Sequence, residues 1–169
     1  MTGRARAQGR GRRGTRGRPA CQRGREPRDS PSMRPGPPRG ATTTVEVVVA
    51  PEQCTRVDGR DDLCLYSTTA LAADIERVCR LVLQPHLEAG ETGIAAHLDL
   101  LHRAPVPCGS TVTLQATVAA VGNSLLTCEV LVRHGGTIVA RGSLEQRIVA
   151  LDRLGSEVAA RRDATSVTG

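Results

Sequence analysis

The sequence has no Lys, Phe or Trp, and only one Tyr (Tyr66) and one Asn (Asn123). Its hydrophobic core must therefore be built from Leu, Val, Ile and Ala, without the aromatic side chains that dominate many cores. All basic side chains other than His are Arg. Because Lys, Phe and Asn have AT-rich codons, a GC-rich genome explains these absences together. The exclusive use of Arg is therefore explained by coding bias first, and by phosphate binding only second.

Two further absences concern membranes and metals. No apolar run approaches the about 18 residues that a transmembrane helix needs, and the basic N-terminus lacks the apolar segment of a secretory signal. The six Cys residues form no C-x-x-C pair, and no His lies at zinc-finger spacing. We therefore expect a reduced, cytoplasmic protein with no disulfide framework, no metal site and no membrane partner.

Charge is distributed very unevenly. Residues 1–40 hold 12 Arg and two acids, a net of +10, whereas the remaining 129 residues hold 11 Arg and 15 acids, a net of −4. Gly, Arg and Pro dominate residues 1–40, which predicts a disordered tail. Arg/Gly segments that bind RNA carry interleaved aromatics for stacking, and this one has none, so nucleic acid is an unlikely partner. The plainer interpretations of this segment are a passive tail or a true start of the protein at Met33.

The rest of the chain predicts one domain over residues 41–155 and a flexible C-terminal tail over residues 156–169. Residues 43–49 are rich in β-branched side chains and predict a strand that Pro51 stops. An irregular polar stretch with a turn at Asp58-Gly59 follows. Hydroxyls at residues 67–69 are typical of a helix start, and Pro85 and Gly90 end that helix. Its apolar stripe consists of Leu71, Ile75, Val78 and Val82.

Four strands follow the helix. Residues 97–102 alternate, with Ala96, Leu98, Leu100 and His102 on one face. Residues 111–118 alternate cleanly, and Gly122-Asn123 predicts a tight turn. A third strand has Leu126, Cys128, Val130 and Val132 on its apolar face, and Gly135-Gly136 leads into a long last strand over residues 137–149. One helix and about five strands predict the α+β hotdog fold, in which a curved antiparallel sheet wraps a central helix. Exposed sheet edges favour at least a homodimer or a dimer of dimers.

Two sequence blocks resemble the fluoroacetyl-CoA thioesterase-like branch of hotdog proteins. Residues 87–93 read Leu-Glu-Ala-Gly-Glu-Thr-Gly, similar to an L-E-x-G-E-x block. Residues 102–113 read His-Arg-Ala-Pro-Val-Pro-Cys-Gly-Ser-Thr-Val-Thr, similar to a strand ending in H-x-A-x-x-P-x-G-x-x-V-T. The resemblance covers about residues 60–155. It implies a hydrolase that cleaves a small acyl-CoA thioester to free acid and CoA, with no cofactor, since CoA is part of the substrate.

The resemblance also implies catalytic roles for Thr68, Glu76 and His102, and substrate contacts near Gly93 and Ala95. Each catalytic candidate has a plainer interpretation. Thr68 could only cap the helix. Glu76, expected to be partly desolvated on the flank of the apolar stripe, could instead pair with Arg80 at i+4. His102 could be a hydrogen-bonded core residue. His97 is a weaker candidate because it shares a face with Asp99.

The sequence departs from the family in two places. The last strand reads Gly142-Ser143-Leu144-Glu145-Gln146, where relatives often carry G-T-H-E-R, so the His and Arg are replaced. The connection over about residues 51–67 is short and has no Phe, whereas fluoroacetate-specific members carry a longer, aromatic lid. A specificity for fluoroacetyl-CoA is therefore not expected. A non-catalytic hotdog protein that binds acyl-CoA or a related ligand is the alternative function.

Overall fold

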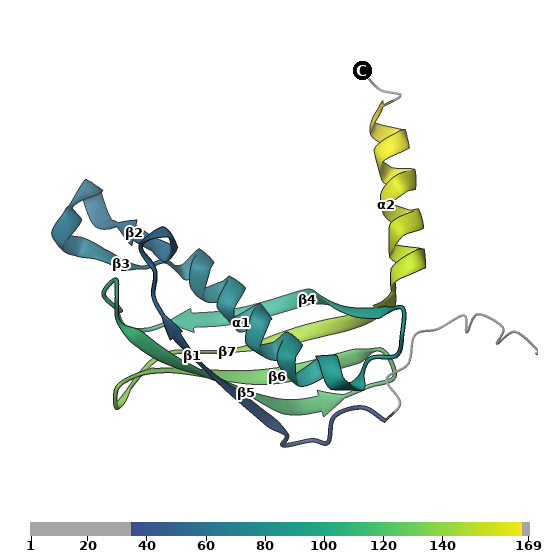
Figure 1. The fold of residues 1–169 in the computed structure, drawn as a ribbon, viewed down its shortest axis with the longest axis horizontal. Helices are drawn as coiled ribbons and strands as arrows, with labels where there is room; N and C mark the ends of the chain where they lie inside the picture. The colour runs from purple at the N-terminus through teal and green to yellow at the C-terminus, as the bar shows by residue number, and fades with distance from the viewer. Residues whose placement is uncertain (1–34, 167–169) are drawn as a thin grey trace, which may run out of the picture.

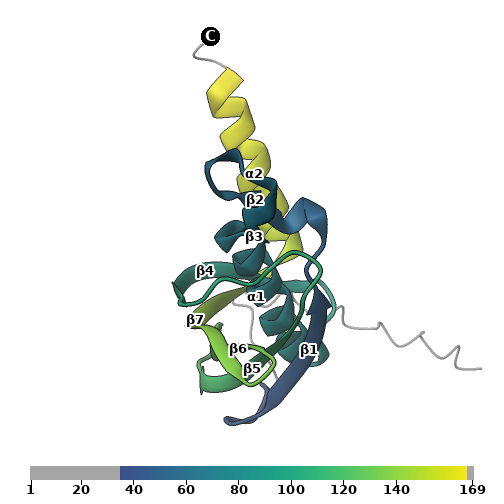
Figure 2. The ribbon, with the colours of Figure 1, turned by 90° about the vertical axis from the view of Figure 1, so that its left-hand side faces the viewer.

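The computed structural model describes residues 35–166, and the expected α+β hotdog arrangement is confirmed. Helix α1 (Thr68–Leu83) crosses one face of an antiparallel five-stranded sheet with the order β1-β5-β6-β7-β4 (Figure 1). The strands of this sheet are β1 (Thr42–Val48), β4 (Glu91–His102), β5 (Thr111–Val121), β6 (Leu125–His134) and β7 (Thr137–Ala150). Seen from the side, the sheet curves around α1 (Figure 2).

The predicted alternation places the core between the sheet and α1. In β5, Val112, Leu114, Ala116 and Val118 are buried, and in β6 the predicted apolar face is buried in full. Since side chains alternate between the two faces of a strand, the intervening residues of β5 and β6 point away from α1.

Helix α1 begins and ends where the sequence indicates. Ser67 is the N-cap, and its side-chain oxygen accepts a hydrogen bond from the backbone N–H of Ala70 at 3.1 Å. The predicted apolar stripe is buried along its length. Pro85 lies in the short 3-10 helix η4 (Gln84–His86), because a proline has no N–H with which to continue an α-helix.

Strand β4 is longer than predicted and contains a β-bulge between Ala95 and His97. Before the bulge, Ala95 lies opposite Gln146, and after it Leu98 lies opposite Leu144. Ala96, which we expected on the same face as Leu98, is the extra residue of the bulge. Among the strands of residues 35–166, β4 pairs only with β7, so no described strand covers its other edge.

The connection over residues 51–67 is more regular than the irregular stretch that the sequence predicted. It contains a two-stranded antiparallel ribbon, β2 (Cys54–Arg56) and β3 (Cys64–Tyr66), with short 3-10 helices η1 (Pro51–Gln53), η2 (Val57–Gly59) and η3 (Asp61–Leu63). The expected turn lies in η2, where Asp58 and Gly59 both have positive φ, of 52° and 72°.

Both predicted domain boundaries need correction. Residues 35–40 pack onto the domain instead of belonging to a tail: Pro37 is buried, and the Gly40 N–H donates to the Val118 carbonyl at 2.8 Å. Residues 1–34, for which we expected disorder, lie outside the described residues.

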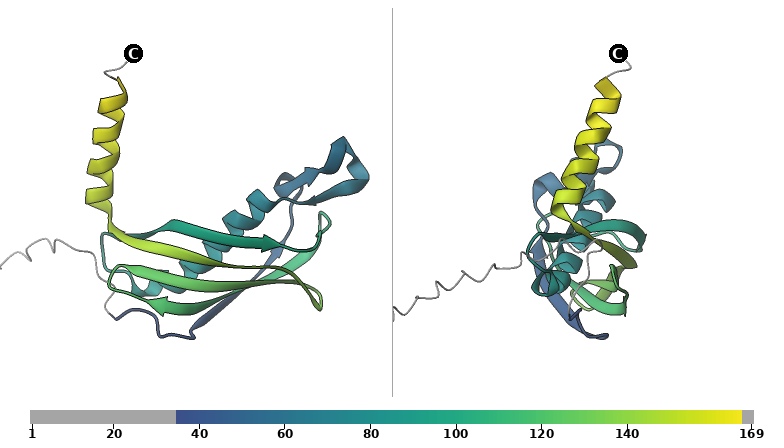
Figure 3. Two further views of the ribbon diagram at one scale, coloured as in Figure 1. Left: turned by 180° about the vertical axis from the view of Figure 1, so that it is seen from behind. Right: turned by 90° about the vertical axis from the view of Figure 1, so that its right-hand side faces the viewer.

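The predicted C-terminal tail is instead largely helical, as helix α2 (Leu151–Ser166), which projects from the sheet (Figures 1 and 3). The Leu151 N–H donates to the Gly90 carbonyl at 2.8 Å, and Arg153 pairs with Glu157 at 3.0 Å within the helix. The sequence did not indicate α2 because its apolar residues at helical spacing, Leu151, Leu154 and Val158, span only two turns. Within residues 35–166, neither α1 nor α2 is apolar and long enough to cross a membrane.

Candidate active site

Thr68 and His102 meet at one end of the sheet. Thr68 is the first residue of α1 and His102 the last residue of β4, and the Oγ1 of Thr68 lies 3.1 Å from the Nδ1 of His102. The pair lines an open hollow of about 360 Å³ between β3, the start of α1 and the segment that follows β4. The structure therefore brings together two of the three catalytic candidates, which are 34 residues apart in sequence.

The other ring nitrogen of His102 is buried. The Nε2 atom makes no hydrogen bond with any of the residues that the structure describes. In the imidazole tautomer with hydrogen on Nε2, Nδ1 accepts the hydroxyl hydrogen of Thr68. A buried polar atom normally has a partner, so the solvent-inaccessible Nε2 can hydrogen-bond only to a group that the surrounding side chains move aside to admit.

Glu76 lies apart from this pair. It is exposed, and it forms no hydrogen bond or ion pair with another residue of the described chain, including Arg80. Eight helical residues separate it from Thr68, a rise of about 12 Å. The expectation of a partly desolvated Glu76 is therefore wrong for a single chain: the sheet wraps the apolar stripe of α1, and Glu76 lies outside that stripe.

The buried acid of α1 is Asp74, which the sequence reading did not single out. Its Oδ2 accepts hydrogen bonds from the Tyr66 hydroxyl at 2.6 Å and from the Gln53 amide at 2.8 Å, and its Oδ1 accepts from Arg77 at 3.0 Å. Burial and this carboxylate raise the pKa of Tyr66. A signal was available, because Leu71, Asp74 and Ile75 follow the i, i+3, i+4 spacing of one helix face. Asp74 positions Tyr66, which lines the hollow.

Gly93 and Ala95 do not reach the hollow in a single chain. Gly93 is buried beneath the end of α1, where an added Cβ would overlap the Leu83 side chain, so packing explains this glycine. Ala95 is exposed at the bulge. It lies seven residues before His102, a separation of about 20 Å along the strand.

In the last strand, the two residues that replace the His and Arg of the family pattern contribute to packing. Leu144 is fully buried in the core, and the buried Gln146 side chain donates to the Cys79 carbonyl of α1 at 3.0 Å. Both side chains therefore hold the sheet to the helix. His97, the weaker candidate, is exposed opposite Glu145 and lies far from the hollow.

Comparisons with known proteins identify the family. A family described as fluoroacetyl-CoA-specific thioesterase matches residues 49–152. The fluoroacetyl-CoA thioesterase of Streptantibioticus cattleyicolor is 26% identical over 94 residues, which cover 56% of this chain and 68% of that protein.

Two solved structures show the same fold. A Thermus thermophilus protein described as a thioesterase superfamily member superposes with a TM-score of 0.70 at 22% identity, covering 78% of this chain and 97% of its own. A fluoroacetyl-CoA thioesterase superposes with a TM-score of 0.66 at 23% identity, covering 73% and 96%.

The family match extends over more than half of the chain and contains β4, α1 and the Thr68–His102 pair. The chain therefore belongs to the fluoroacetyl-CoA-specific thioesterase family, which confirms that it is a thioester hydrolase acting on acyl-CoA.

Proposed function

We propose that this protein hydrolyses the thioester of a small acyl-CoA in the hollow that Thr68 and His102 line. The observation that supports it most directly is the 3.1 Å contact between these two side chains at the N-terminus of α1. A helix N-terminus presents backbone N–H groups and a partial positive charge. These groups favour the negative charge that develops on a thioester carbonyl when it is attacked.

Water and the thioester are the only reactants. Attack on the carbonyl carbon breaks the C–S bond, and the products are the free acid and the CoA thiol. In this scheme His102, in the tautomer with hydrogen on Nε2, donates that proton to the leaving sulfur once the side chains that cover Nε2 have moved. Thr68 holds the imidazole through Nδ1. Glu76 acts as the base for water or as the nucleophile.

A second copy of the chain supplies the missing parts. The open edge of β4 can pair with the same strand of another chain. An antiparallel pair with its two-fold axis midway between residues 95 and 102 sets Ala95 beside the partner's His102. The same axis makes the two α1 helices antiparallel, which brings Glu76 nearer to the partner's Thr68. We therefore propose a homodimer, with a dimer of dimers as the larger assembly.

The acyl group is small but is not restricted to fluoroacetyl. Apart from the His102 imidazole, Tyr66 is the one aromatic side chain among the residues that line the hollow of about 360 Å³. The ribbon of β2 and β3 lies between β1 and α1, where the family resemblance implies an aromatic lid, and it contains no Phe. Without that lid, discrimination between acetyl, fluoroacetyl and propionyl groups rests on the size of the hollow alone, which amounts to about 10- to 200-fold for each methylene.

Thiol release from a panel of short acyl-CoAs tests the proposal. We expect His102→Ala to lower kcat/KM by about 10²–10⁴-fold, Glu76→Gln to do the same, and Thr68→Val to lower it by about tenfold. His86→Ala is the matched imidazole control at the other end of α1. Glu46→Gln, on the opposite sheet edge, is the carboxylate control. Both controls should retain activity.

Three results would count against parts of the scheme. Tight binding of acyl-CoA without thiol release by the wild type would favour the non-catalytic ligand-binding alternative. Full activity of Glu76→Gln would remove Glu76 from the mechanism. Full activity in a protein that sediments as a monomer at assay concentration would remove the requirement for the partner subunit.

A further inference from the structure

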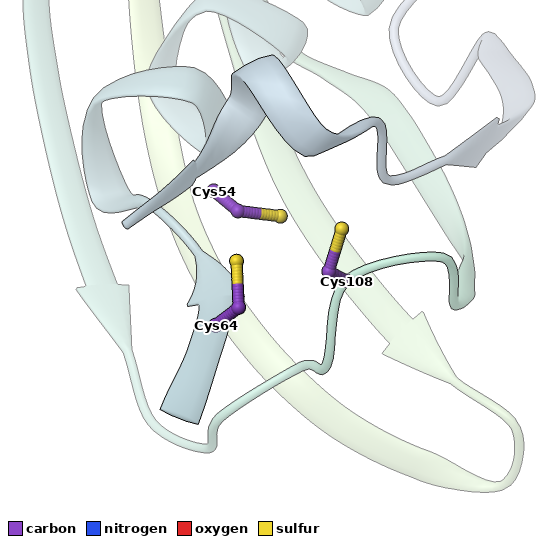
Figure 4. A group of neighbouring side chains, drawn as sticks. All are labelled: Cys54, Cys64 and Cys108. Carbon is purple, nitrogen blue, oxygen red and sulfur yellow. The ribbon is translucent and has the colours of Figure 1, made fainter. Parts of the chain in front are cut away.

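Three Cys side chains converge on one point at the end of the ribbon. Cys54 comes from β2, Cys64 from β3, and Cys108 from the segment between β4 and β5 (Figure 4). Their sulfur atoms all lie within 4.8 Å of one another, and each side chain is partly exposed. The sequence predicted no metal site, because these residues are 10 and 44 positions apart and show no paired spacing.

Backbone contacts, rather than the thiols themselves, hold the three residues together. The two ribbon strands pair antiparallel, with Arg56 opposite Cys64 and Cys54 opposite Tyr66. The Cys108 N–H donates to the Cys64 carbonyl at 3.1 Å, and a single β-bridge joins Leu65 to Pro107. The scaffold is therefore formed before any ligand arrives, as a specific binding site requires.

Two of the thiols make hydrogen bonds to nearby backbone. The Cys54 thiol donates to the Ala50 carbonyl at 3.3 Å, and the Cys108 thiol donates to the Val49 carbonyl at 3.9 Å. A bound cation would replace these thiol protons.

We propose that Cys54, Cys64 and Cys108 bind one thiophilic d¹⁰ cation, Zn²⁺ or Cu⁺, through three thiolates. Soft thiolate ligands select these ions. With zinc–sulfur distances of about 2.3 Å, the sulfurs of a tetrahedral site lie about 3.8 Å apart, so the thiols need to move inward by about 1 Å or less. Zn²⁺ would take solvent as its fourth ligand because the cluster is partly exposed. Each thiol releases one proton on binding.

The site goes beyond the proposed hydrolysis and does not depend on it. The bound cation would tie both ribbon strands to the segment that follows β4. Thr55 and Leu65, the residues next to Cys54 and Cys64, line the hollow that Thr68 and His102 share. The cation would therefore hold one wall of the candidate active site in place.

Competition with a chromophoric chelator tests the site on the full-length, reduced protein. We expect one Zn²⁺ per chain, with about three protons released, and separately one Cu⁺ per chain when the titrant is Cu⁺ under anaerobic conditions. Cys54→Ser, Cys64→Ser and Cys108→Ser should each weaken binding by more than about 100-fold, since even residues outside the ligand shell change affinity by 10–100-fold. X-ray absorption of the loaded wild type should count three sulfur ligands.

Cys128→Ala is the control, because it removes a thiol that is buried in the core, outside the cluster. It should leave the affinity unchanged. No uptake of either ion by the reduced wild type would overturn the proposal, as would an affinity that survives all three cluster variants or a count of fewer than three sulfurs. A disulfide between two of the three residues, with no metal uptake after reduction, would overturn it as well.

Discussion

The two halves of helix α1 lie under the same sheet but are stabilised in different ways. Its first half buries Leu71 and Ile75 and adds polar contacts: Ser67 caps it, Asp74 accepts hydrogen bonds from Tyr66 and Gln53, and Thr68 meets His102. Its second half is packed, with Val78, Cys79, Val82 and Leu83 buried and Gly93 beneath the helix end.

This difference shows where the fold leaves room for chemistry. A packed interface tolerates little change in volume, so the second half of α1 fixes the helix on the sheet. The first half holds its polar groups through directed hydrogen bonds, which set the orientation of side chains around the hollow. The variants below test this division, beginning with the largest expected loss of stability.

Asp74→Ala should have the largest effect, lowering the free energy of unfolding by about 3 kcal/mol, because it leaves the buried Tyr66 hydroxyl and the Gln53 amide without their acceptor. Chemical denaturation measures the loss. Glu76→Ala, two positions away and exposed, is the matched control and should change stability by less than about 0.5 kcal/mol. Equal losses in the two variants would show that the carboxylate network contributes little.

Gly93→Ala should cost about 2 kcal/mol, because the added methyl group overpacks the buried Leu83 side chain. The double variant Gly93→Ala with Leu83→Ala should be less unstable than the sum of the two single variants, since shortening Leu83 makes room for the methyl group. Strict additivity of the two losses would rule out the contact as the cause. A loss of stability greater than that of Asp74→Ala would show that the second half of α1 contributes more to stability than the first.

Tyr66→Phe should cost about 1.5 kcal/mol near neutral pH, since it removes a buried hydrogen bond to Asp74. The folded protein holds the phenol proton more tightly than the unfolded chain does, because burial and Asp74 raise the pKa of Tyr66. The wild type should therefore lose this stabilisation as pH rises above about 10. The gap between wild type and Tyr66→Phe should narrow in that range, and a constant gap would contradict the linkage.

Ser67→Ala should have the smallest effect, about 1 kcal/mol, because one N-terminal N–H of α1 loses its acceptor. Ser67→Asp should recover most of that stability, since a carboxylate can also accept this hydrogen bond and suits the helix dipole. Thermal unfolding of the three proteins measures both changes. Failure of the Asp variant to recover stability would mean that Ser67 acts through something other than capping.

Most of the fold could be predicted because its local patterns agree with one another. Alternation over β5 and β6, the apolar stripe of α1 and the glycine turns all indicated the same arrangement. Helix α2 was missed because its apolar stripe is limited to Leu151, Leu154 and Val158. The ribbon of β2 and β3 was missed because each strand has only three residues.

The site was predicted less completely than the fold. The contact of Thr68 with His102 followed the family resemblance. Asp74 is buried and Glu76 is exposed because the two residues lie on different sides of α1. The position of the apolar stripe already indicated which side is buried. The three-Cys cluster could not be predicted, because convergence of residues from β2, β3 and a distant loop is a property of tertiary structure.

The bulge in β4 determines which way His102 points. Before the bulge, Gly93 faces the helix, and after it even-numbered residues such as Leu98 and His102 face inward. Deleting Ala96 would merely straighten the strand, whereas deleting one residue between Leu98 and His102 would turn the imidazole outward. The number of residues between Leu98 and His102 is therefore more constrained than their identity. Insertion or deletion of one codon there would keep the sheet but turn the His102 side chain to the opposite face.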